Sequence, residues 1–178
     1  MRARSLSHIG ITVSDFNTAV KFYSEVFGCP LVGVSDAEPE RVRAFFGVDG
    51  PAPACKIGWV RVPGGGILEI FSFEPKLPPE AKIPWNRTGI THYSFNVRNC
   101  QKWYDYLQSK GVECLSKPEQ SPRGHWFFFA KDMDGNLIEM IDLGYMFYVL
   151  QWLGPLGGIL FRRGRYQKYY EPKGKAPQ

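Results

Sequence analysis

The 178-residue sequence lacks the cysteine patterns that staple small secreted domains or bind metals in short motifs. Its four cysteines (Cys29, Cys55, Cys100 and Cys114) are widely spaced and form no CxxC pair, so we expect reduced thiols. The start of the chain shows no apolar h-region typical of a signal peptide, and no apolar run reaches about 18 residues. We therefore expect a cytoplasmic protein without a transmembrane segment.

Most of the chain also lacks a net charge of either sign. The net charge is +5, but six of the 22 basic and one of the 17 acidic side chains follow Leu143. This leaves 16 of each before that point, so the body is neutral and the basicity belongs to the C-terminal extension. We expect no nucleic-acid partner for the body.

An internal repeat is the main positive signal. HIGITVSDFNTAVKFYSEVFG, from His8, aligns with HYSFNVRNCQKWYDYLQSKGV, from His92. Each copy predicts a short alternating strand, then an Asx residue that caps an amphipathic helix, and a glycine at the end of that helix. Downstream, GGILEIF aligns with GNLIEMI, which places Glu69 on Glu139.

The coarse pattern is thus βαβββ written twice. It predicts an α+β fold in which two paired modules form a curved mixed sheet around a metal-binding cleft, followed by a C-terminal extension. The ranges are 1–74 for the first module, 75–89 for a Pro-rich linker, 90–143 for the second module and 144–178 for the extension. The first module holds a charged, Gly/Pro-rich insertion with a short helical core at 42–46.

The repeat places one histidine on each first strand and one glutamate on each last strand. A carboxylate inside an apolar run is unfavourable unless something pairs with it. If the modules pack with approximate two-fold symmetry, His8, Glu69, His92 and Glu139 converge. Two imidazoles and two carboxylates suit one divalent metal ion, either Ni, Co, Zn, Mn or Fe.

Strand alternation extends the predicted cleft beyond these four residues. A list of further candidates follows from it and from the neighbouring loops: Thr12, Ser94, Asn96, Phe71, Arg123 and His125. The first three offer hydrogen bonds to a polar ligand, while Arg123 suits a carboxylate or phosphate. For each of these residues an ordinary structural or surface role remains open.

Three segments carry a resemblance to a known family: HIGITVSDFNTAVKFYSEVFG, GITHYSFNVRN and FFFAKDMDGNLIEMIDL. Together they resemble the vicinal oxygen chelate superfamily over about residues 6–143, and the His/Glu/His/Glu set looks most like its glyoxalase I and methylmalonyl-CoA epimerase members. The resemblance implies a small-molecule substrate that chelates the metal through adjacent oxygens. Metal binding stabilises an enediolate or enolate, and Glu139 or Glu69 moves the proton.

The leading hypothesis is accordingly a metal-dependent isomerase or lyase of the glyoxalase or acyl-CoA epimerase type. One alternative is a non-haem Fe(II) ring-cleaving dioxygenase of the extradiol type, although such enzymes use two histidines and one carboxylate. Another is a non-catalytic small-molecule-binding protein of the same fold. We also expect a homodimer, because paired-module proteins of this kind commonly dimerise.

The extension combines an apolar run broken by GPLGG with the basic aromatic run RRGRYQKYY. Such runs can bind nucleic acid or anionic membranes. We expect instead that the apolar part packs across the cleft or a dimer interface and that the basic part is solvated.

Overall fold

The computed structural model describes residues 5–78 and 85–170 of the chain. Positions 79–84 of the predicted linker and 171–178 of the predicted extension lie outside the described residues. The strands are β1 (His8–Thr12), β2 (Leu31–Ala37), β3 (Ala54–Arg61), β4 (Ile67–Glu74), β5 (Tyr93–Asn96), β6 (Glu119–Gln120), β7 (Trp126–Lys131) and β8 (Leu137–Asp142). The helices are α1 (Phe16–Phe27), α2 (Pro39–Arg41), the π-helical turn η1 (Val42–Phe46), α3 (Cys100–Ser109), α4 (Met146–Arg163) and the 3₁₀ turn η2 (Gln167–Tyr169).

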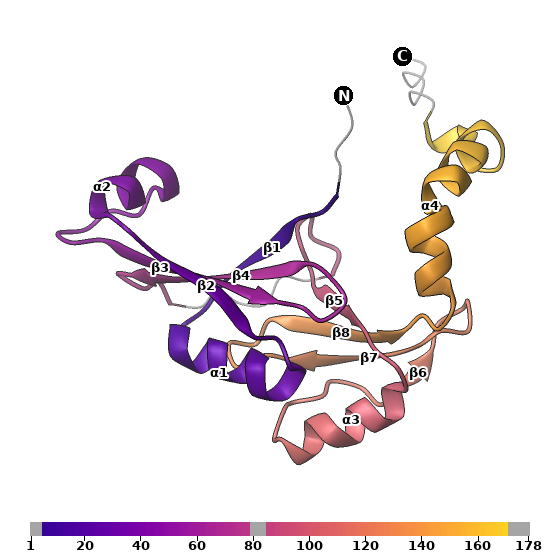
Figure 1. Cartoon of the computed structure of the whole chain (residues 1–178), viewed down its shortest axis with the longest axis horizontal. Helices are drawn as coiled ribbons and strands as arrows, with labels where there is room; N and C mark the ends of the chain where they lie inside the picture. Colours follow the sequence, from indigo (N-terminus) through magenta and orange to yellow (C-terminus); the bar gives the residue numbers. More distant parts are fainter. Residues whose placement is uncertain (1–4, 79–84, 171–178) are drawn as a thin grey trace.

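The strands form two four-stranded mixed sheets with the same topology. One has the order β1-β4-β3-β2 and the other β5-β8-β7-β6. In each sheet the first strand runs parallel to the last, and the remaining neighbours are antiparallel. Figure 1 shows the two sheets side by side, with α1 and α3 below them. The prediction of an α+β fold built from two βαβββ modules is confirmed.

Both long helices of the modules begin where the sequence predicted. The Asp15 carboxylate accepts a hydrogen bond from the Thr18 backbone N–H (2.7 Å), and the Asn99 side chain accepts one from Lys102 (3.0 Å). These caps satisfy N–H groups that the first turn of a helix leaves without partners. Gly28 ends α1 in a left-handed conformation (φ 65°), which glycine adopts without strain.

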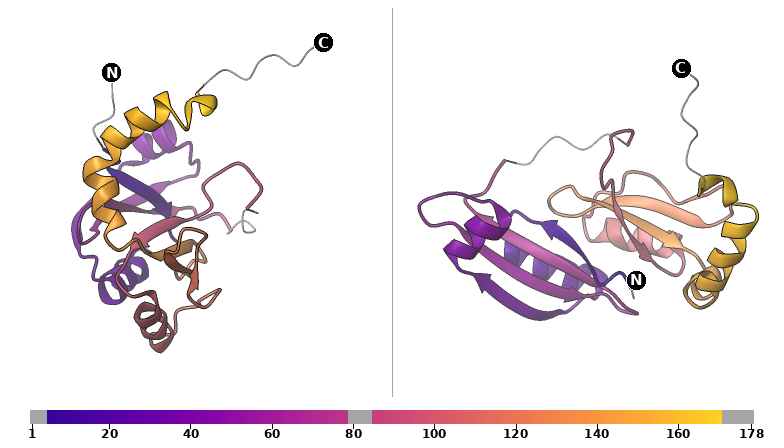
Figure 2. Two further views of the ribbon diagram at one scale, coloured as in Figure 1. Left: turned by 90° about the vertical axis from the view of Figure 1, so that its right-hand side faces the viewer. Right: turned by 90° about the horizontal axis from the view of Figure 1, so that it is seen from above.

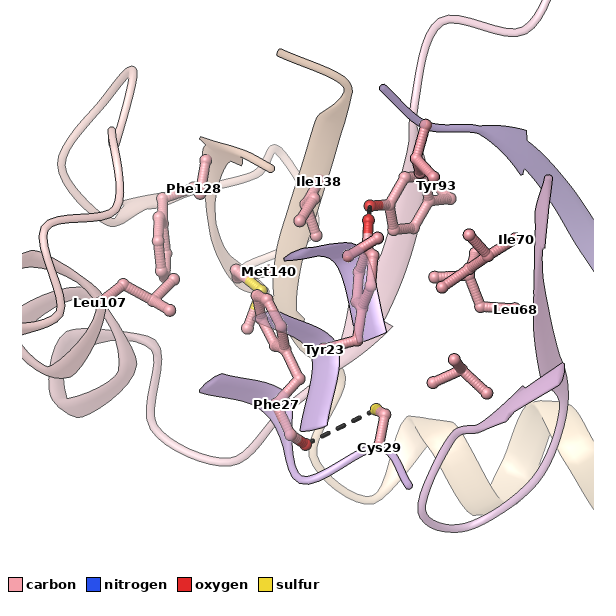
Figure 3. Packing of buried hydrophobic residues seen from close by; sticks show 14 of the residues in the cluster. Tyr23, Phe27, Cys29, Leu68, Ile70, Tyr93, Leu107, Phe128, Ile138 and Met140 are labelled. Atoms are coloured by element: carbon pink, nitrogen blue, oxygen red, sulfur yellow. Dashed lines mark hydrogen bonds between the residues drawn. The ribbon is translucent and has the colours of Figure 1, made fainter. Parts of the chain in front are cut away.

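One hydrophobic core joins the two modules. It contains Tyr23 and Phe27 from α1, Leu68 and Ile70 from β4, and a matching set from β5, α3, β7 and β8 (Figure 3). Phe27 contacts Phe95 at a ring distance of 5.0 Å. Helix α1 thus packs against its own sheet and also against the second module.

A buried polar network crosses the same boundary. The Tyr23 hydroxyl donates to Asp132 Oδ2 (2.8 Å) and lies 2.5 Å from the Tyr93 hydroxyl. Figure 3 shows the two tyrosine hydroxyls pointing toward each other. Asp132 also accepts hydrogen bonds from the backbone N–H groups of Asp134 and Asn136 and from the Asn136 side chain. Burial, reinforced by neighbouring Asp132, raises the pKa of both tyrosines well above the ordinary value. The network therefore couples α1 to the tight turn that leads into β8.

The extension forms helix α4, which continues through the GPLGG segment without a break. Pro155 lies inside it, with Gly154, Gly157 and Gly158 nearby. Relative to alanine, a proline in mid-helix costs about 3 kcal/mol and each glycine about 1 kcal/mol. No α4 residue is buried, and the helix projects from the end of β8 on the side opposite α1 and α3 (Figures 1 and 2). Within the two described ranges, no helix is both long and apolar enough to cross a membrane.

Candidate functional site: two His–Glu pairs

The first pair joins the start of β1 to the middle of β4. His8 Nε2 lies 3.2 Å from Glu69 Oε2, and the glutamate side chain is only 14% exposed. The second carboxylate oxygen accepts a hydrogen bond from the Trp59 indole N–H (2.9 Å). On the far side of the imidazole, His8 Nδ1 lies 2.8 Å from the Ser7 hydroxyl. The pair is therefore held from both ends.

The second pair repeats this arrangement in the other module. His92 Nε2 lies 3.7 Å from Glu139 Oε2, and Nδ1 lies 2.9 Å from the Thr91 hydroxyl. Aromatic rings replace the indole donor here, because Phe129 faces Glu139 across the sheet. Phe129 and Trp85 each approach the His92 ring at 5.3 Å. Glu139 thus lacks the neighbouring indole N–H that holds Glu69.

Strand register explains why the two pairs match. Glu69 pairs with Gly10, two residues after His8, and Glu139 pairs with Ser94, two residues after His92. Because side chains alternate along a strand, each His and Glu face the same side of their sheet, away from the buried Leu68, Ile70 and Met140. This is the open face of the sheets, opposite α1 and α3.

The structure brings the four predicted ligands together in two pairs rather than in one cluster. Across the described ranges, no group of three or more His, Cys, Asp or Glu side chains could hold a metal ion. The start of β1, with His8, shares a small hollow with Tyr93–Phe95, while the end of β1 shares another with Ile90 and Thr91, next to His92 in the chain.

Each pair has the donors of half a metal site. The hydrogen bond between each hydroxyl and Nδ1 fits either ring tautomer. In the tautomer that donates Nδ1–H to the hydroxyl, Nε2 has a free lone pair that faces a carboxylate oxygen. Two acceptors in contact repel unless a proton or a cation lies between them. The hydroxyl contact also fixes the orientation of the ring, as partners of metal-binding histidines do. The residues present therefore fit a divalent metal, with two donors from each pair.

The other predicted cleft residues divide between the open face and structural roles. Thr12 lines the larger hollow, of about 1030 Å³, and Ser94 lines the smaller one beside His8. Asn96 accepts a hydrogen bond from the Leu143 backbone N–H and so anchors the chain after β8. Arg123 is exposed at the β6–β7 hairpin, and the backbone N–H of His125 there donates to the Ser121 hydroxyl.

Phe71 belongs to an aromatic cluster on the open face of the first sheet. Its ring stacks on that of Phe73 at 6.1 Å, and Phe46 from η1 contacts both, at 5.8 and 5.3 Å. The predicted helical core of the insertion is thus the element that brings Phe46 over β4. The cluster gives the first module an apolar wall near Glu69 that the second module builds differently, with Trp85 and Phe129 (5.3 Å).

Sequence reasoning missed the supporting groups. Ser7 and Thr91 each directly precede a repeated histidine, so a repeated hydroxyl–His dipeptide was a usable signal. The role of Trp59 depends on its position opposite Glu69 in the β3–β4 pairing, which the sequence does not reveal. The thiols take no part: burial raises the pKa of Cys29, Cys55 and Cys100 to about 11.

Comparison with known proteins matches this chain to one superfamily and to named relatives. The model of the Glyoxalase/Bleomycin resistance protein/Dioxygenase superfamily matches residues 5–140. The chain is 35% identical over 149 residues to a lactoylglutathione lyase of Schizosaccharomyces pombe, covering 80% of this chain and 48% of the relative. It is also 30% identical over 151 residues to a 2-epi-5-epi-valiolone epimerase of an Actinomyces species, covering 79% and 80%. The chain thus spans about half the length of the first relative and most of the second.

Solved structures agree on the fold. A glyoxalase family protein from Bacillus cereus superposes with a TM-score of 0.68 at 20% identity, covering 80% of this chain and 95% of the other. At that identity the likeness concerns the arrangement of the elements.

Proposed function

The chain belongs to the Glyoxalase/Bleomycin resistance protein/Dioxygenase superfamily, and we propose that it is a metal-dependent lyase or isomerase acting on a small oxygenated substrate. The observation that carries this proposal is the pair of matching His–Glu contacts, each with a hydroxyl on Nδ1. The relatives named as a lyase and as an epimerase support this class of reaction.

The full ligand set requires two copies of the chain in this proposal. One chain holds His8 with Glu69 at one place and His92 with Glu139 at another. In a two-fold symmetric dimer, the first pair of one copy meets the second pair of the other, which creates two equivalent four-donor sites. Each chain then contributes half of each site.

The two glutamates have different roles in the proposed reaction. When bound, a divalent metal would polarise adjacent substrate oxygens and lower the pKa of the neighbouring C–H group. Glu139, opposite Phe129, is the better base, and its carboxylate takes the proton and returns it to the same or the adjacent carbon. Glu69 is held by the Trp59 indole and serves as a ligand. The aromatic side chains around His92 exclude water from the proton transfer.

Subunit mixing tests the shared site directly. One variant combines His8→Ala with Glu69→Gln, and the other combines His92→Ala with Glu139→Gln, so each lacks one whole pair. Alone, each should retain almost no metal and no turnover. A mixed dimer keeps one intact site of its two, and half of a random mixture is mixed dimer, so about a quarter of wild-type metal content and turnover should return.

Thermal unfolding of both variants provides the control, because partly exposed pairs can be removed with little loss of fold. Mixing each variant with itself through the same unfolding and refolding step controls for handling. If the mixture binds no more metal than either variant alone, the shared-site proposal is wrong. Single substitutions add detail: Glu69→Gln and His92→Ala should each abolish turnover, and full activity in either refutes the metal mechanism.

Elemental analysis of protein purified without chelators identifies the metal. We expect one ion of Ni, Co, Zn or Mn per chain, and turnover of methylglyoxal hemithioacetals or acyl-CoA epimers that a chelator removes and the metal restores. Stoichiometric iron that oxidises in air would instead favour the ring-cleaving dioxygenase. A chain that takes up no metal at all would refute the proposal in favour of a binding protein.

A further inference from the structure

We propose that the C-terminal extension is an interfacial anchor that binds an anionic lipid surface through α4 and the basic run that ends it. The basic run is defined here as residues 162–170. Three features carry the proposal: an exposed apolar stripe, a one-signed charge beside it, and a helix that is weak without a supporting surface.

Apolar side chains surround most of α4 and gather most densely in a stripe along one side of it, while Leu150 (55% exposed) and Phe161 (50% exposed) lie outside that stripe. At 100° per residue its members fall within roughly 140° of the helix circumference. They are Tyr145, Tyr148, Val149, Trp152, Leu153, Leu156, Ile159 and Leu160. Trp152 is 75% exposed and Leu160 is 72% exposed, although both are large and apolar. Exposed apolar surface of this extent, gathered on one element, marks an interaction site.

The charge beside the stripe has a single sign. Arg162, Arg163, Arg165 and Lys168 follow within seven residues, and positions 144–170 contain no Asp or Glu. Among the described residues these four cations form none of the ion pairs. Three of them lie over tyrosine rings instead, for example Arg162 on Tyr170 at 4.9 Å. Tyrosine with arginine or lysine is typical of residues at the level of lipid headgroups.

The composition of α4 indicates that the helix gains stability when its apolar face packs against a surface. Its centre contains Pro155 and three glycines, all unfavourable in a helix interior, and it buries no side chain against the body. Helices of this kind depend on packing of an apolar face. With 18 residues, about 27 Å at 1.5 Å per residue, α4 is suited to lie in the membrane surface, as amphipathic helices with Trp, Leu and flanking Arg do.

Charge complementarity favours a lipid surface over a second copy of the chain. A second copy offers a neutral body and an equally basic extension, so it supplies an apolar surface but no anionic one. An anionic bilayer supplies both. The helix also projects away from the sheets, on the side opposite α1 and α3 (Figures 1 and 2).

Vesicle co-sedimentation of the full chain tests the proposal. We expect binding to vesicles of phosphatidylcholine with phosphatidylglycerol, little binding to phosphatidylcholine alone, and weakening with salt. Replacing the four cations of the basic run by glutamine should weaken binding on the order of several hundredfold, since each contributes about fivefold. Trp152→Glu combined with Leu156→Glu should abolish binding. All six positions are exposed, so the body should keep its thermal stability.

Matched controls use the same changes on the body. Glutamine at Lys21, Lys102, Lys110 and Lys117 removes the same charge from α1, α3 and the loop after α3, and Val32→Glu combined with Val34→Glu adds the same two charges at exposed positions of β2. Neither should reduce vesicle binding. Three results overturn the proposal: equal binding to neutral vesicles, stripe variants that dissociate a dimer while the wild type ignores vesicles, or tight binding of a duplex oligonucleotide without vesicle binding.

Discussion

Replacement of Tyr23 by phenylalanine removes one oxygen from the centre of the molecule. Tyr23 is fully buried, and its hydroxyl donates to Asp132. The Tyr93 hydroxyl must then donate to the Tyr23 oxygen, 2.5 Å away. The substitution therefore takes one hydrogen bond from a carboxylate that is 6% exposed and leaves the Tyr93 hydroxyl without its acceptor.

The expected loss of stability follows from those two effects. A hydrogen bond to a charged group contributes about 1.5–3 kcal/mol, and an orphaned buried hydroxyl costs about 1–3 kcal/mol. We expect Tyr23→Phe to lower the free energy of unfolding by about 3 kcal/mol, and Tyr93→Phe by about 1 kcal/mol, because Tyr23 then still donates to Asp132. The double variant should resemble Tyr23→Phe, since no hydroxyl is left orphaned.

Urea unfolding followed by circular dichroism measures all three variants, and the double-mutant cycle gives the coupling between the two tyrosines. For a chain of this size, about 3 kcal/mol corresponds to about 6–12 °C in Tm. A Tyr23→Phe variant within about 0.5 kcal/mol of wild type, or strictly additive losses in the double variant, would falsify the hydrogen-bond order Tyr93 to Tyr23 to Asp132.

Two further predictions concern pH. Burial raises the pKa of Tyr23 and Tyr93, so the folded chain keeps protons that the unfolded chain loses above about pH 10. The free energy of unfolding should therefore fall above that pH by up to about 1.4 kcal/mol per pH unit for each tyrosine. In the double phenylalanine variant it should fall less steeply. Cys29, Cys55 and Cys100, with pKa values of about 11, should carry about a hundredfold less thiolate at pH 8 than a thiol of pKa 9. Rapid alkylation of any of these three thiols by iodoacetamide in the native protein, mapped by peptide mass spectrometry because Cys114 is only partly buried, would contradict this.

Local signals in the sequence predicted the parts of the fold that depend on neighbours along the chain. Asp15 and Asn99 cap their helices because an Asx side chain reaches a backbone N–H three residues on. The alignment of Glu69 with Glu139 reflects a shared strand register, and the structure places each beside the histidine of its own repeat. The module boundaries and the common metal site stay predictions.

Long-range geometry supplied what the sequence could not. The Trp59–Glu69 contact depends on which residues of β3 and β4 face each other, and the Tyr23–Tyr93–Asp132 network on how the modules pack. The structure holds the four repeated side chains as two separate His–Glu pairs, although the repeat alone suggested one cluster. The GPLGG segment was interpreted as a break, yet the backbone continues through it as helix.

An indole ring lies beside each His–Glu pair, so tryptophan fluorescence can report on each half of the site. Trp59 donates to Glu69, and the Trp85 ring lies 5.3 Å from the His92 ring. An indole changes its emission when the charge on its hydrogen-bond acceptor or on an adjacent ring changes. A chain with Trp59 as its single tryptophan would therefore report ligation of the first pair by fluorescence, and one with Trp85 would report the second. Metal binding at each half of the site could then be followed by fluorescence titration, without knowledge of the substrate.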